Sequence, residues 1–552
     1  MNNYFVYHLH TELSLQDSCT NHKLYANKAV ELGQKAICYS EHGNIYNWIE
    51  KKLYANKVGL KYIHGCEVYL TEKLYWPPDD THTKQYKIRD NYHTILIAKN
   101  YEGLKELNVL IGNATDEDHK YYNPRITFDE FFSISDNIIK ISACLASPLR
   151  NYNRKENYDK AIYDKLAQTY DYYEIQPHIN NDQIQYNRYL YELSLKTGKP
   201  LILGTDTHSL NEYKAECRKV LKRAKKMKWD DEDTFDLTYK SYDELVEMMR
   251  KQDSLPEAVF LQAIENTNVV ESMCEDFELD VSFKYPILYD NEEDVLKARI
   301  SRMYHEKLKN GIIHNNPEYK ERIKEELRVF KKINMIGFML FMSELVCWCW
   351  DNGIPVGPCR GSVGGSMIAY ITDIIDVNPI VWDTIFSRFA NESRTEIGDI
   401  DLDICPSQRQ LVYNHIIDKF GQDKTGYILA IGTISDKGTI DEIGRGLSYI
   451  WNDEHPNQEK DNPYSLNVVA EIKHAYENNP EEARKKYPEL FYYFDGLLNT
   501  AISQSMHPAG IVVSPVTLPD NYGEFWSDGK RIMYINMEEI HEISLVKYDI
   551  LG

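Results

Sequence analysis

Two groups of residues have the types and spacing that metal-dependent phosphate chemistry requires. The first is a turn of small residues, Gly357-Pro-Cys-Arg-Gly-Ser-Val-Gly-Gly-Ser366, followed by Asp399-Ile-Asp-Leu-Asp403. Side chains on a strand alternate between its two faces, so Asp399, Asp401 and Asp403 are expected on one face. Like charges this close repel unless a cation lies between them, and Mg²⁺ bound by carboxylates and substrate phosphates is a common solution. Because backbone N–H groups and hydroxyls of the turn could hold those phosphates, the combination indicates nucleotidyl transfer.

The second group consists of histidine, carboxylate and cysteine residues that follow successive β-rich runs in the first half of the chain. A lone histidine is usually an ordinary core or surface residue, but nine suitable residues at strand ends are difficult to obtain by chance. Three or four of them suit one Zn²⁺, and nine suit two or three ions. The mixture of ligand types is compatible with Zn²⁺, Mn²⁺ or iron. The candidate ligands are His8, His10, Asp17, His42, Glu67, His93, Cys144, Asp206 and His208.

The elements that position this second group alternate between strand and helix from residue 1 to about 275. Repeated β-then-α order predicts parallel strands, and seven such units predict a closed βα barrel. In such barrels the chemistry lies at the C-terminal ends of the strands, which is where the nine residues fall. The predicted strands are Tyr4–His10, Ala36–Ser40, Lys61–Tyr69, Thr94–Ala98, Ile138–Ala143, Tyr172–Gln176 and Leu201–Gly204, with amphipathic segments such as Asn21–Leu32 and Asp182–Thr197 between them.

The chain changes character between residue 276 and about 430. Apolar residues at helical spacing predict a helix over Asn315–Lys332. The apolar run Ile336–Trp350 is too short for a membrane span and predicts a buried core helix. Ile368–Asp373 predicts a helix whose N-terminus faces the small-residue turn, an arrangement that favours a phosphate.

The bulk properties are those of a globular protein. The length of 552 residues suggests three to four domains, and 43% hydrophobic residues are enough for packed cores. No signal-peptide pattern or long apolar run occurs, and the 10 cysteines contain no Cys-x-x-Cys pair, so we expect a cytoplasmic protein with no membrane partner. The net charge of −22 opposes tight binding of duplex DNA by the whole surface, so DNA contacts must come from local basic patches such as Lys222–Lys228 and Lys437–Arg445.

The nine candidate ligands, together with Glu41-His42-Gly43-Asn44, resemble the polymerase-and-histidinol-phosphatase (PHP) domain. The resemblance implies a metal-dependent phosphoesterase on a distorted seven-stranded βα barrel, which in some replicative polymerases acts as a 3′–5′ exonuclease. Every ligand position of that family is occupied here, so the site is expected to bind metal. A purely structural role for the metal is the alternative.

The later motifs resemble the C-family replicative DNA polymerases, the bacterial DNA polymerase III alpha subunits. This resemblance covers essentially the whole chain and implies an α/β multidomain protein. The implied domains are the PHP domain (1–275), a first part of a nucleotidyltransferase-type α+β palm (276–430), an inserted helical thumb (431–510) and a second part of the palm (511–552). The matching segments are Asp351–Ser366, Asp399–Asp403, Gly432-Thr433, Gly444-Arg445, His507–Val513 and Leu545–Gly552.

The resemblance also implies roles for individual residues. Three aspartates would hold two Mg²⁺ ions, Lys547 would contact primer or phosphate, and Asp399 matches no family ligand and would have at most a supporting role. The aspartates are Asp401, Asp403 and Asp549; the triphosphate of the dNTP would lie on Arg360, Gly361, Ser362, Gly365 and Ser366; and primer–template DNA would contact Lys437, Arg445 and His507.

The sequence departs from the family pattern in a few places. Cys359 stands where a glycine is usual, and Gly398 and Ile404 flank the aspartates where proline and an aromatic residue are typical. Family members continue past Gly552 with fingers and a clamp-binding region. We therefore expect a second polypeptide that carries fingers, or a truncated chain. The sliding clamp is expected to bind only through those other regions. The expected setting is a bacterial cell or a bacteriophage-infected host. Two alternatives remain: a stand-alone PHP nuclease whose palm is a DNA-binding platform, and a non-catalytic replication assembly subunit.

Overall fold

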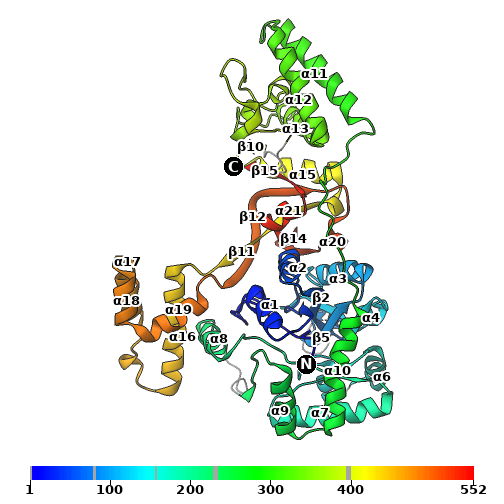
Figure 1. Ribbon diagram of the computed structural model, residues 1–552, viewed down its shortest axis with the longest axis vertical. Helices are drawn as coiled ribbons and strands as arrows, with labels where there is room; N and C mark the ends of the chain where they lie inside the picture. Colours follow the sequence, from blue (N-terminus) through cyan, green and yellow to red (C-terminus); the bar gives the residue numbers. More distant parts are fainter. Residues whose placement is uncertain (1–2, 79–82, 156–157, 228–233, 393–399) are drawn as a thin grey trace. The chain divides into compact units, whose positions relative to one another are not determined.

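The computed structural model describes residues 3–78, 83–155, 158–227, 234–392 and 400–552, so Asp399 and Gly398 lie outside the described residues. The chain divides into two compact units. Unit 1 contains residues 1–278, 430–505 and 522–529, and unit 2 contains residues 279–429, 506–521 and 530–552. Both units combine helices and strands (Figure 1), which confirms the expected α/β multidomain class.

The strands of unit 1 form a sheet in the order β1-β2-β5-β7, continued by single bridges. β1 (Ala36–Tyr39) and β2 (Lys61–Thr71) are parallel, while β5 (Tyr92–Ala98) is antiparallel to both β2 and β7 (Ile138–Ile141). A parallel bridge from Ile141 to Tyr172 leads to β8 and β9, which are parallel. Bridges Leu9–Thr207 and Val6–Ile37 return the pairing to β1. In this sheet β8 is Tyr173–Ile175 and β9 is Leu201–Leu203. A further strand, β6 (Arg125–Thr127), pairs with β2.

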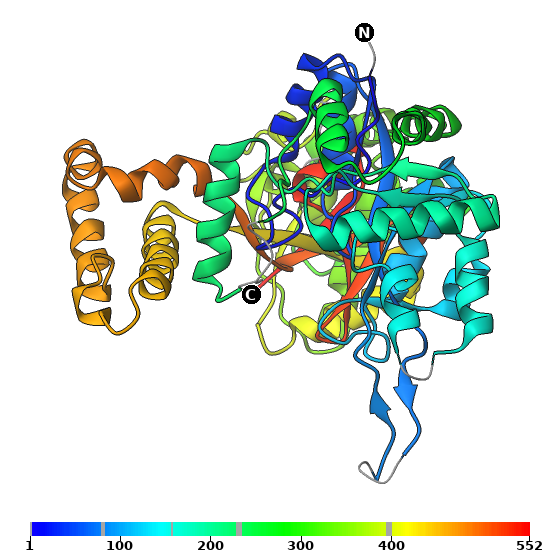
Figure 2. The same cartoon turned by 90° about the horizontal axis from the view of Figure 1, so that it is seen from below.

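Two expectations about these strands are wrong. The strands are not all parallel, because β5 runs against its neighbours. The described residues of the connection from β2 to β5 contain no helix but a two-stranded ribbon, β3 (Tyr75–Trp76) and β4 (Tyr86–Lys87), and only a parallel pair needs a long crossover. Figure 2 shows this ribbon extending from unit 1. The segment 4–10 is not a continuous strand, since it bridges β1 and Thr207 at one residue each.

Isoleucine-rich strands and helices with clear end signals build unit 1. Ile95, Ile97, Ile139 and Ile141 are fully buried in one cluster inside the sheet. A Thr127–Glu130 capping box starts α4, and such reciprocal bonds satisfy backbone N–H groups that the first helical turn leaves unpaired. The helices are α1 (His22–Glu31), α2 (Trp48–Lys57), α3 (Tyr101–Asn113), α4 (Phe128–Ser133), α5 (Pro148–Asn151), α6 (Lys160–Thr169), α7 (Asn181–Thr197), α8 (Glu212–Ala224), α9 (Tyr242–Gln252) and α10 (Glu257–Met273).

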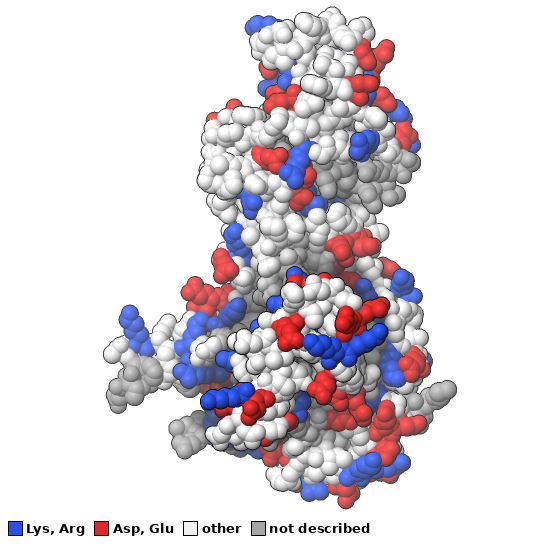
Figure 3. All heavy atoms as spheres, turned by 90° about the vertical axis from the view of Figure 1, so that its left-hand side faces the viewer, with Lys and Arg blue, Asp and Glu red and all other residues white. Residues whose placement is uncertain are grey.

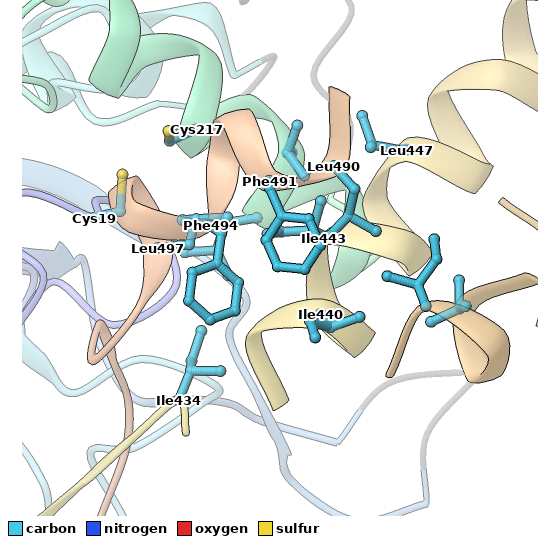
Figure 4. Packing of buried hydrophobic residues seen from close by; sticks show 14 of the residues in the cluster. Cys19, Cys217, Ile434, Ile440, Ile443, Leu447, Leu490, Phe491, Phe494 and Leu497 are labelled. Carbon is cyan, nitrogen blue, oxygen red and sulfur yellow. The ribbon is translucent and has the colours of Figure 1, made fainter. Parts of the chain in front are cut away.

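Four later helices belong to unit 1 (Figure 2). They are α16 (Asp436–Glu454), α17 (Leu466–Asn478), α18 (Pro480–Lys486) and α19 (Pro488–Leu497). Of these, α16 and α19 pack against α8, while α17 packs on α16 and α18 packs on α17 and α19. Figure 4 shows the apolar cluster between them, in which Cys217 and Leu221 of α8 pack with Ile443 of α16 and Phe494 of α19. A Cβ on Gly446 of α16 would lie 2.2 Å from a backbone oxygen of α8, so the two helices approach as closely as a glycine permits.

Unit 2 is built on a sheet with the order β10-β15-β12-β11-β14. One face of β15 packs on helix α13, where Tyr548 is buried against Phe338 and Phe341. The strands are β10 (Asp401–Asp403), β11 (Thr425–Thr433), β12 (Ala501–Val513), β14 (Lys530–Asn536) and β15 (Val546–Leu551); the helices are α11 (Glu292–Lys309), α12 (Pro317–Lys332), α13 (Ile336–Asp351), α14 (Met367–Ile371), α15 (Arg409–Phe420), α20 (Leu518–Asn521) and α21 (Met537–Glu542).

The predicted helices of this region are confirmed as α12, α13 and α14. Most of α13 is buried, as expected for a core helix. Among the described residues no single helix is long and apolar enough to span a membrane. Only α12 and α13 taken together have the length and apolar composition for a span, and a bend of 117° lies between these two helices.

Candidate functional site

All nine predicted ligands of unit 1 lie in one cluster. Their ligand atoms form three groups within 4.8 Å: His10 with His42 and His208, His8 with His10 and Asp206, and Glu67 with His93 and Cys144. Asp17 completes the set, because its Oδ2 lies 3.1 Å from His42 Nε2 and 3.3 Å from His208 Nε2.

The strand ends explain how residues from distant parts of the sequence meet. Cys144 and Asp206 follow the C-terminal ends of β7 and β9. His93 is the second residue of β5, and because β5 runs in the opposite direction, its N-terminal end reaches the edge where the other strands end. Ala143 (φ 58°) and Asp206 (φ 47°) adopt the left-handed region, which non-glycine residues rarely do and which concentrates at functional sites.

The cluster is a coupled set of charges. Burial disfavours a charged His8, but the carboxylates of Glu174 and Asp206 outweigh burial and raise its pKa well above the ordinary value. Burial likewise opposes ionisation of Glu67, yet His93 and His42 hold its pKa well below the usual range. In contrast, burial and the neighbouring His42 and His208 lower the pKa of His10 to about 3. The buried carboxylates therefore favour a positive charge among them.

The donor set fits metal ions. Within the described residues, His8 Nε2, His10 Nε2 and both carboxylate oxygens of Glu67 are buried without a hydrogen bond of ordinary geometry. Buried polar atoms are nearly always paired, so atoms left in this way require an explanation such as an ion. Imidazole, carboxylate and thiolate groups are all ligands of transition metals, and the cluster can therefore hold metal ions.

Sequence reasoning missed Glu174, which orients His8. His8 Nδ1 lies 2.8 Å from Glu174 Oε1, and the Tyr7 hydroxyl donates to the same carboxylate at 2.9 Å. A carboxylate bound to Nδ1 holds the proton there and leaves Nε2 for a metal. Gly204 makes room, because a Cβ there would lie 2.2 Å from the Glu174 carboxyl carbon. A lone acid inside the apolar strand run Tyr172–Gln176 was the signal available in the sequence.

Sequence reasoning also missed how α8 holds Asp17. Arg218 Nη2 donates to Asp17 Oδ1 at 2.7 Å, and Lys222 Nζ lies 3.1 Å from the same oxygen. Burial would raise the pKa of Asp17, but Arg218 and His208 lower it well below its usual range. Helix α8 therefore contacts the candidate ligand Asp17 through its basic side chains, and it contacts α16 and α19 through its apolar side chains.

The three aspartates of unit 2 are also brought together. β10 and β15 are parallel with Asp401 opposite Asp549, and Asp403 shares the face of Asp401. Leu402, Tyr548 and Ile550, which alternate with them, are buried in the core. Asp549 Oδ1 is buried without a hydrogen bond of ordinary geometry within the described residues, so this face is also suited to cations.

Two basic side chains neutralise these aspartates. Lys547 Nζ lies 2.5 Å from Asp549 Oδ2, and both residues are on one face of β15. Arg360 Nη1 lies 3.1 Å from Asp403 Oδ1, and its Nε lies 3.6 Å from Asp401 Oδ2. The structure therefore places Arg360 and Lys547 directly at the carboxylates.

The small-residue turn forms a 3₁₀ turn over Gly361–Gly365, in which Gly361 and Ser362 are accessible. The expectation that the N-terminus of α14 is open to a phosphate is wrong. Glu326 of α12, which is fully buried, accepts from Met367 N at 2.8 Å, Ile368 N at 2.9 Å and the Ser366 hydroxyl at 2.7 Å. A protein carboxylate thus takes the positive end of this helix, and Gly365 and Ser366 are buried.

The predicted DNA contacts lie on both units. Lys437 and Arg445 are exposed on α16 of unit 1, where they pair with Glu477 and, at 3.2 Å, Glu442. His507 belongs to β12 of unit 2, and its Nδ1 accepts from Gly510 N at 3.2 Å. Basic and acidic side chains are interspersed on the face drawn in Figure 3. The basic residues of α16 are therefore balanced by acids, in agreement with the negative net charge.

Two family models match the chain. Residues 7–178 match the PHP domain family, and residues 294–552 match the family described as the bacterial DNA polymerase III alpha NTPase domain. Among solved structures, a two-domain protein from Bacteroides vulgatus that contains a predicted PHP-like metal-dependent phosphoesterase aligns over 45% of this chain and 63% of its own. Its identity is 13% and its TM-score 0.24, too low to indicate a shared overall fold.

Curated relatives cover nearly the whole chain. The DNA polymerase III subunit alpha of Borreliella burgdorferi is 30% identical, with 99% of this chain and 48% of the relative aligned. That of Aquifex aeolicus is 28% identical, with 99% and 51% aligned. The chain therefore spans about half the length of these relatives. With both family models matched in this order, the chain belongs to the C-family DNA polymerase III alpha subunits and corresponds to their N-terminal, PHP-containing portion.

Proposed function

We propose that the chain contributes the PHP, palm and thumb parts of a replicative DNA polymerase that adds dNTPs to a primer on a DNA template. In this proposal residues 1–275 form a distorted seven-stranded PHP barrel, residues 276–430 and 511–552 a nucleotidyltransferase-type palm, and residues 431–510 the thumb. The observation that carries the proposal is the pairing of Asp401 with Asp549 on adjacent strands, with Arg360 and Lys547 at the carboxylates.

The three aspartates would hold two Mg²⁺ ions, which supply activation of the primer 3′-hydroxyl and neutralise charge on the phosphates. The residues of the chain then orient the substrates. Arg360 and Lys547 offer positive charge to the triphosphate, and the accessible Gly361 N–H and Ser362 hydroxyl offer hydrogen bonds to it. Lys437, Arg445 and His507 would contact the backbone of primer–template DNA.

The relatives are about twice as long as the chain. We propose that regions corresponding to the unmatched half of these relatives contribute fingers that complete the nucleotide site, and that those regions carry any contact with the sliding clamp. The test is primer extension by the completed polymerase. Asp549→Asn should lower kcat by about 10³-fold or more, because a ligand of the ions that neutralise the phosphate charge in the transition state is lost.

Asp423→Asn is the matched control, since Asp423 is exposed and pairs with Arg531 away from the aspartates. Extension by Asp549→Asn at the rate of this control would refute the proposed palm.

A second activity has its own observation, the cluster of nine ligands in unit 1. We propose that this cluster holds two or three Zn²⁺, Mn²⁺ or iron ions and hydrolyses phosphodiesters at the 3′ end of DNA. His8, His10 and Glu67 would hold ions through their buried ring nitrogens and carboxylate oxygens, and the ions would supply an activated water. Glu174 keeps the proton of His8 on Nδ1.

His10→Ala should abolish exonuclease activity on single-stranded DNA and leave primer extension unchanged. Thermal unfolding of the same variant shows whether the fold survives the change. Metal stripping that lowers the melting temperature, together with no nuclease activity in Zn²⁺, Mn²⁺ or Fe²⁺, would instead favour structural ions and an assembly role.

A further inference from the structure

A buried ion pair that has no part in the sites described above adjoins the metal-ligand cluster of unit 1. Glu41 directly precedes the candidate ligand His42, and Lys51 of α2 donates to Glu41 Oε1 at 2.6 Å. The two side chains are only 1% and 2% exposed. Taking two charges out of water is costly, and a buried pair is weak evidence of a gain in stability. The neighbours of Glu41 give the pair another use.

The carboxylate of Glu41 is surrounded by donors. Besides Lys51, it accepts from the backbone N–H of Thr11 at 3.0 Å, from the Thr11 hydroxyl, and from the Ser14 hydroxyl at 2.6 Å. An ionised carboxylate can only accept, so the single proton of the Ser14 hydroxyl points to Glu41 Oε2. The Ser14 oxygen therefore has two lone pairs and no further proton to donate.

Both lone pairs of Ser14 are used by candidate ligands. The backbone N–H of His42 donates to Ser14 Oγ at 3.1 Å, and His10 Nδ1 lies 3.0 Å from the same oxygen. Because Ser14 can only accept there, the ring proton of His10 lies on Nδ1, and Nε2 is left as the metal-binding atom. We call this set, Lys51, Glu41, Ser14 and His10, the serine relay.

The serine relay opposes the pull of other carboxylates on the same proton. His10 Nε2 lies 3.4 Å from Asp206 Oδ1 and 3.5 Å from Glu67 Oε2. Without an acceptor at Nδ1, these anions would draw the ring proton to Nε2, the atom that an ion needs. At His8 the carboxylate of Glu174 holds the proton on Nδ1 directly, at 2.8 Å. At His10 one hydroxyl stands between the ring and the carboxylate.

We propose that Glu41, acting through the Ser14 hydroxyl, positions His10 for metal binding by holding its ring proton on Nδ1, while Lys51 balances the charge of Glu41. All three are positioning residues, since none of them is one of the nine candidate ligands. The inference deepens the proposed nuclease function and rests on it, because the presentation of Nε2 matters only where the cluster holds an ion. Partners of this kind contribute about 10–100-fold to metal affinity.

The first measurement locates the ring proton in the full chain, labelled with ¹⁵N at histidine and held in EDTA so that no ion is bound. Nuclear magnetic resonance distinguishes ring nitrogens that carry a proton from those that do not, and the signals lost in His10→Asn identify His10. The parent should carry the proton on Nδ1. Ser14→Ala should move it to Nε2, because only the carboxylates of Asp206 and Glu67 then compete for it.

The second measurement is calorimetric titration of the full chain with Mn²⁺. Ser14→Ala should lower the affinity about 10–100-fold. The carboxylate is tested by Glu41→Gln combined with Lys51→Met, which removes both charges together and leaves no buried charge unpaired. This double variant should lower the affinity by a similar factor. Adding Ser14→Ala to it should cause little further loss, because residues that act as one unit are not additive.

Ser18→Ala is the matched control. Ser18 is as buried as Ser14 and lies in the same loop. Its hydroxyl donates to the backbone oxygen of His208 at 2.7 Å and accepts from Thr20 N at 3.3 Å, so it contacts no imidazole nitrogen. Both serine variants should lower the melting temperature in EDTA, since each loses a buried hydroxyl. Only Ser14→Ala should move the ring proton and lower the affinity for Mn²⁺.

Equal Mn²⁺ affinity of the parent and Ser14→Ala would overturn the inference, as would a ring proton that stays on Nδ1 in Ser14→Ala. A full additional loss when Ser14→Ala is added to the double variant would refute the part of Glu41. A parent chain that binds no metal would overturn the inference together with the nuclease function. A parent whose metal affinity depends on Ser14 but which cleaves no phosphodiester would refute the nuclease function alone and leave the serine relay in place.

Discussion

The contact between α8 and α16 makes a prediction that can be worked out from one atom. Gly446→Ala would place a Cβ 2.2 Å from Val220 O, whereas a carbon and a carbonyl oxygen approach to about 3.3 Å. The helices must therefore separate by about 1 Å, which loosens the apolar cluster of Figure 4. Overpacking of this kind costs about 1–3 kcal/mol, and alanine regains about 1 kcal/mol over glycine in a helix. We expect a net loss of about 0–2 kcal/mol.

Gly438→Ala on the same helix is the matched control. Its Cβ would meet only side chains of its own end of α16, Ile434 at 3.2 Å and Ser435 at 3.4 Å. The substitution should therefore be neutral or stabilise α16 by up to about 1 kcal/mol. The assay is native-state hydrogen exchange of the backbone amides of α8 and α16, which reports the free energy of local opening. Gly446→Ala with the protection of Gly438→Ala would refute the close approach of the two helices.

The same substitution tests whether α8 connects the two parts of unit 1. Arg218 and Lys222 of α8 hold Asp17 on the side of the metal ligands. A shift of α8 by about 1 Å would lengthen these contacts, so Gly446→Ala should also weaken metal binding. Unchanged metal affinity together with lowered protection would show that the helix moves without carrying Asp17 with it.

Three further predictions concern the candidate sites. Glu174→Gln keeps the shape of the side chain but removes the charge that orients His8, so metal affinity measured by calorimetric titration should fall about 10–100-fold. An affinity equal to that of the parent would contradict the orienting role. Mn²⁺ or Zn²⁺ at 100 times its Kd for the cluster should stabilise unit 1 by about 2.7 kcal/mol and raise its melting temperature, and EDTA should reverse the rise. A melting temperature that does not respond to metal would exclude binding to the folded state. Burial raises the pKa of Glu326 from its ordinary value of 4.5 to about 7, despite the groups that donate to it. The contribution of Glu326 to the free energy of unfolding is therefore complete below about pH 4.5 and is lost as the pH rises through 7. In urea unfolding, the parent should lose about 3 kcal/mol of this free energy relative to Glu326→Gln across that window. A difference that stays constant with pH would contradict the raised pKa.

The clustering of the nine candidate ligands was predictable because their signal is local. Each lies at or just beyond a run of β-forming residues, and that position alone indicates an edge of a sheet. The reversed direction of β5 was not predicted, although two signals were present. His93 lies at the N-terminal end of the strand, which reaches the edge of the other ligands only if the strand is reversed, and the described residues before it contain no crossover helix. Glu174 had a signal, an acid in an apolar strand, but the residue it orients is 166 positions away.

The interactions that escaped prediction are those that join distant segments through buried polar atoms. Glu326 meets Ser366 across 40 residues, and α12 shows the pattern of an ordinary amphipathic helix in which one more glutamate is unremarkable. The packing of α16 and α19 on α8 is non-local as well, because an apolar face indicates that a helix is covered but not by which element.

The capture of the α14 N-terminus by Glu326 restricts where a triphosphate can lie. A phosphate at Met367 N would have to displace a buried carboxylate that accepts three hydrogen bonds there. The accessible donors of the turn are instead at its start, where a Cβ on Gly361 would lie 3.9 Å from Asp401 Oδ2. Arg322 supports this arrangement from behind, since it pairs with Glu326 at 2.9 Å and donates to Gly365 O at 2.9 Å. The rigid end of the turn is thus fixed by α12, and the phosphates are left to the end that carries Arg360 and faces the aspartates.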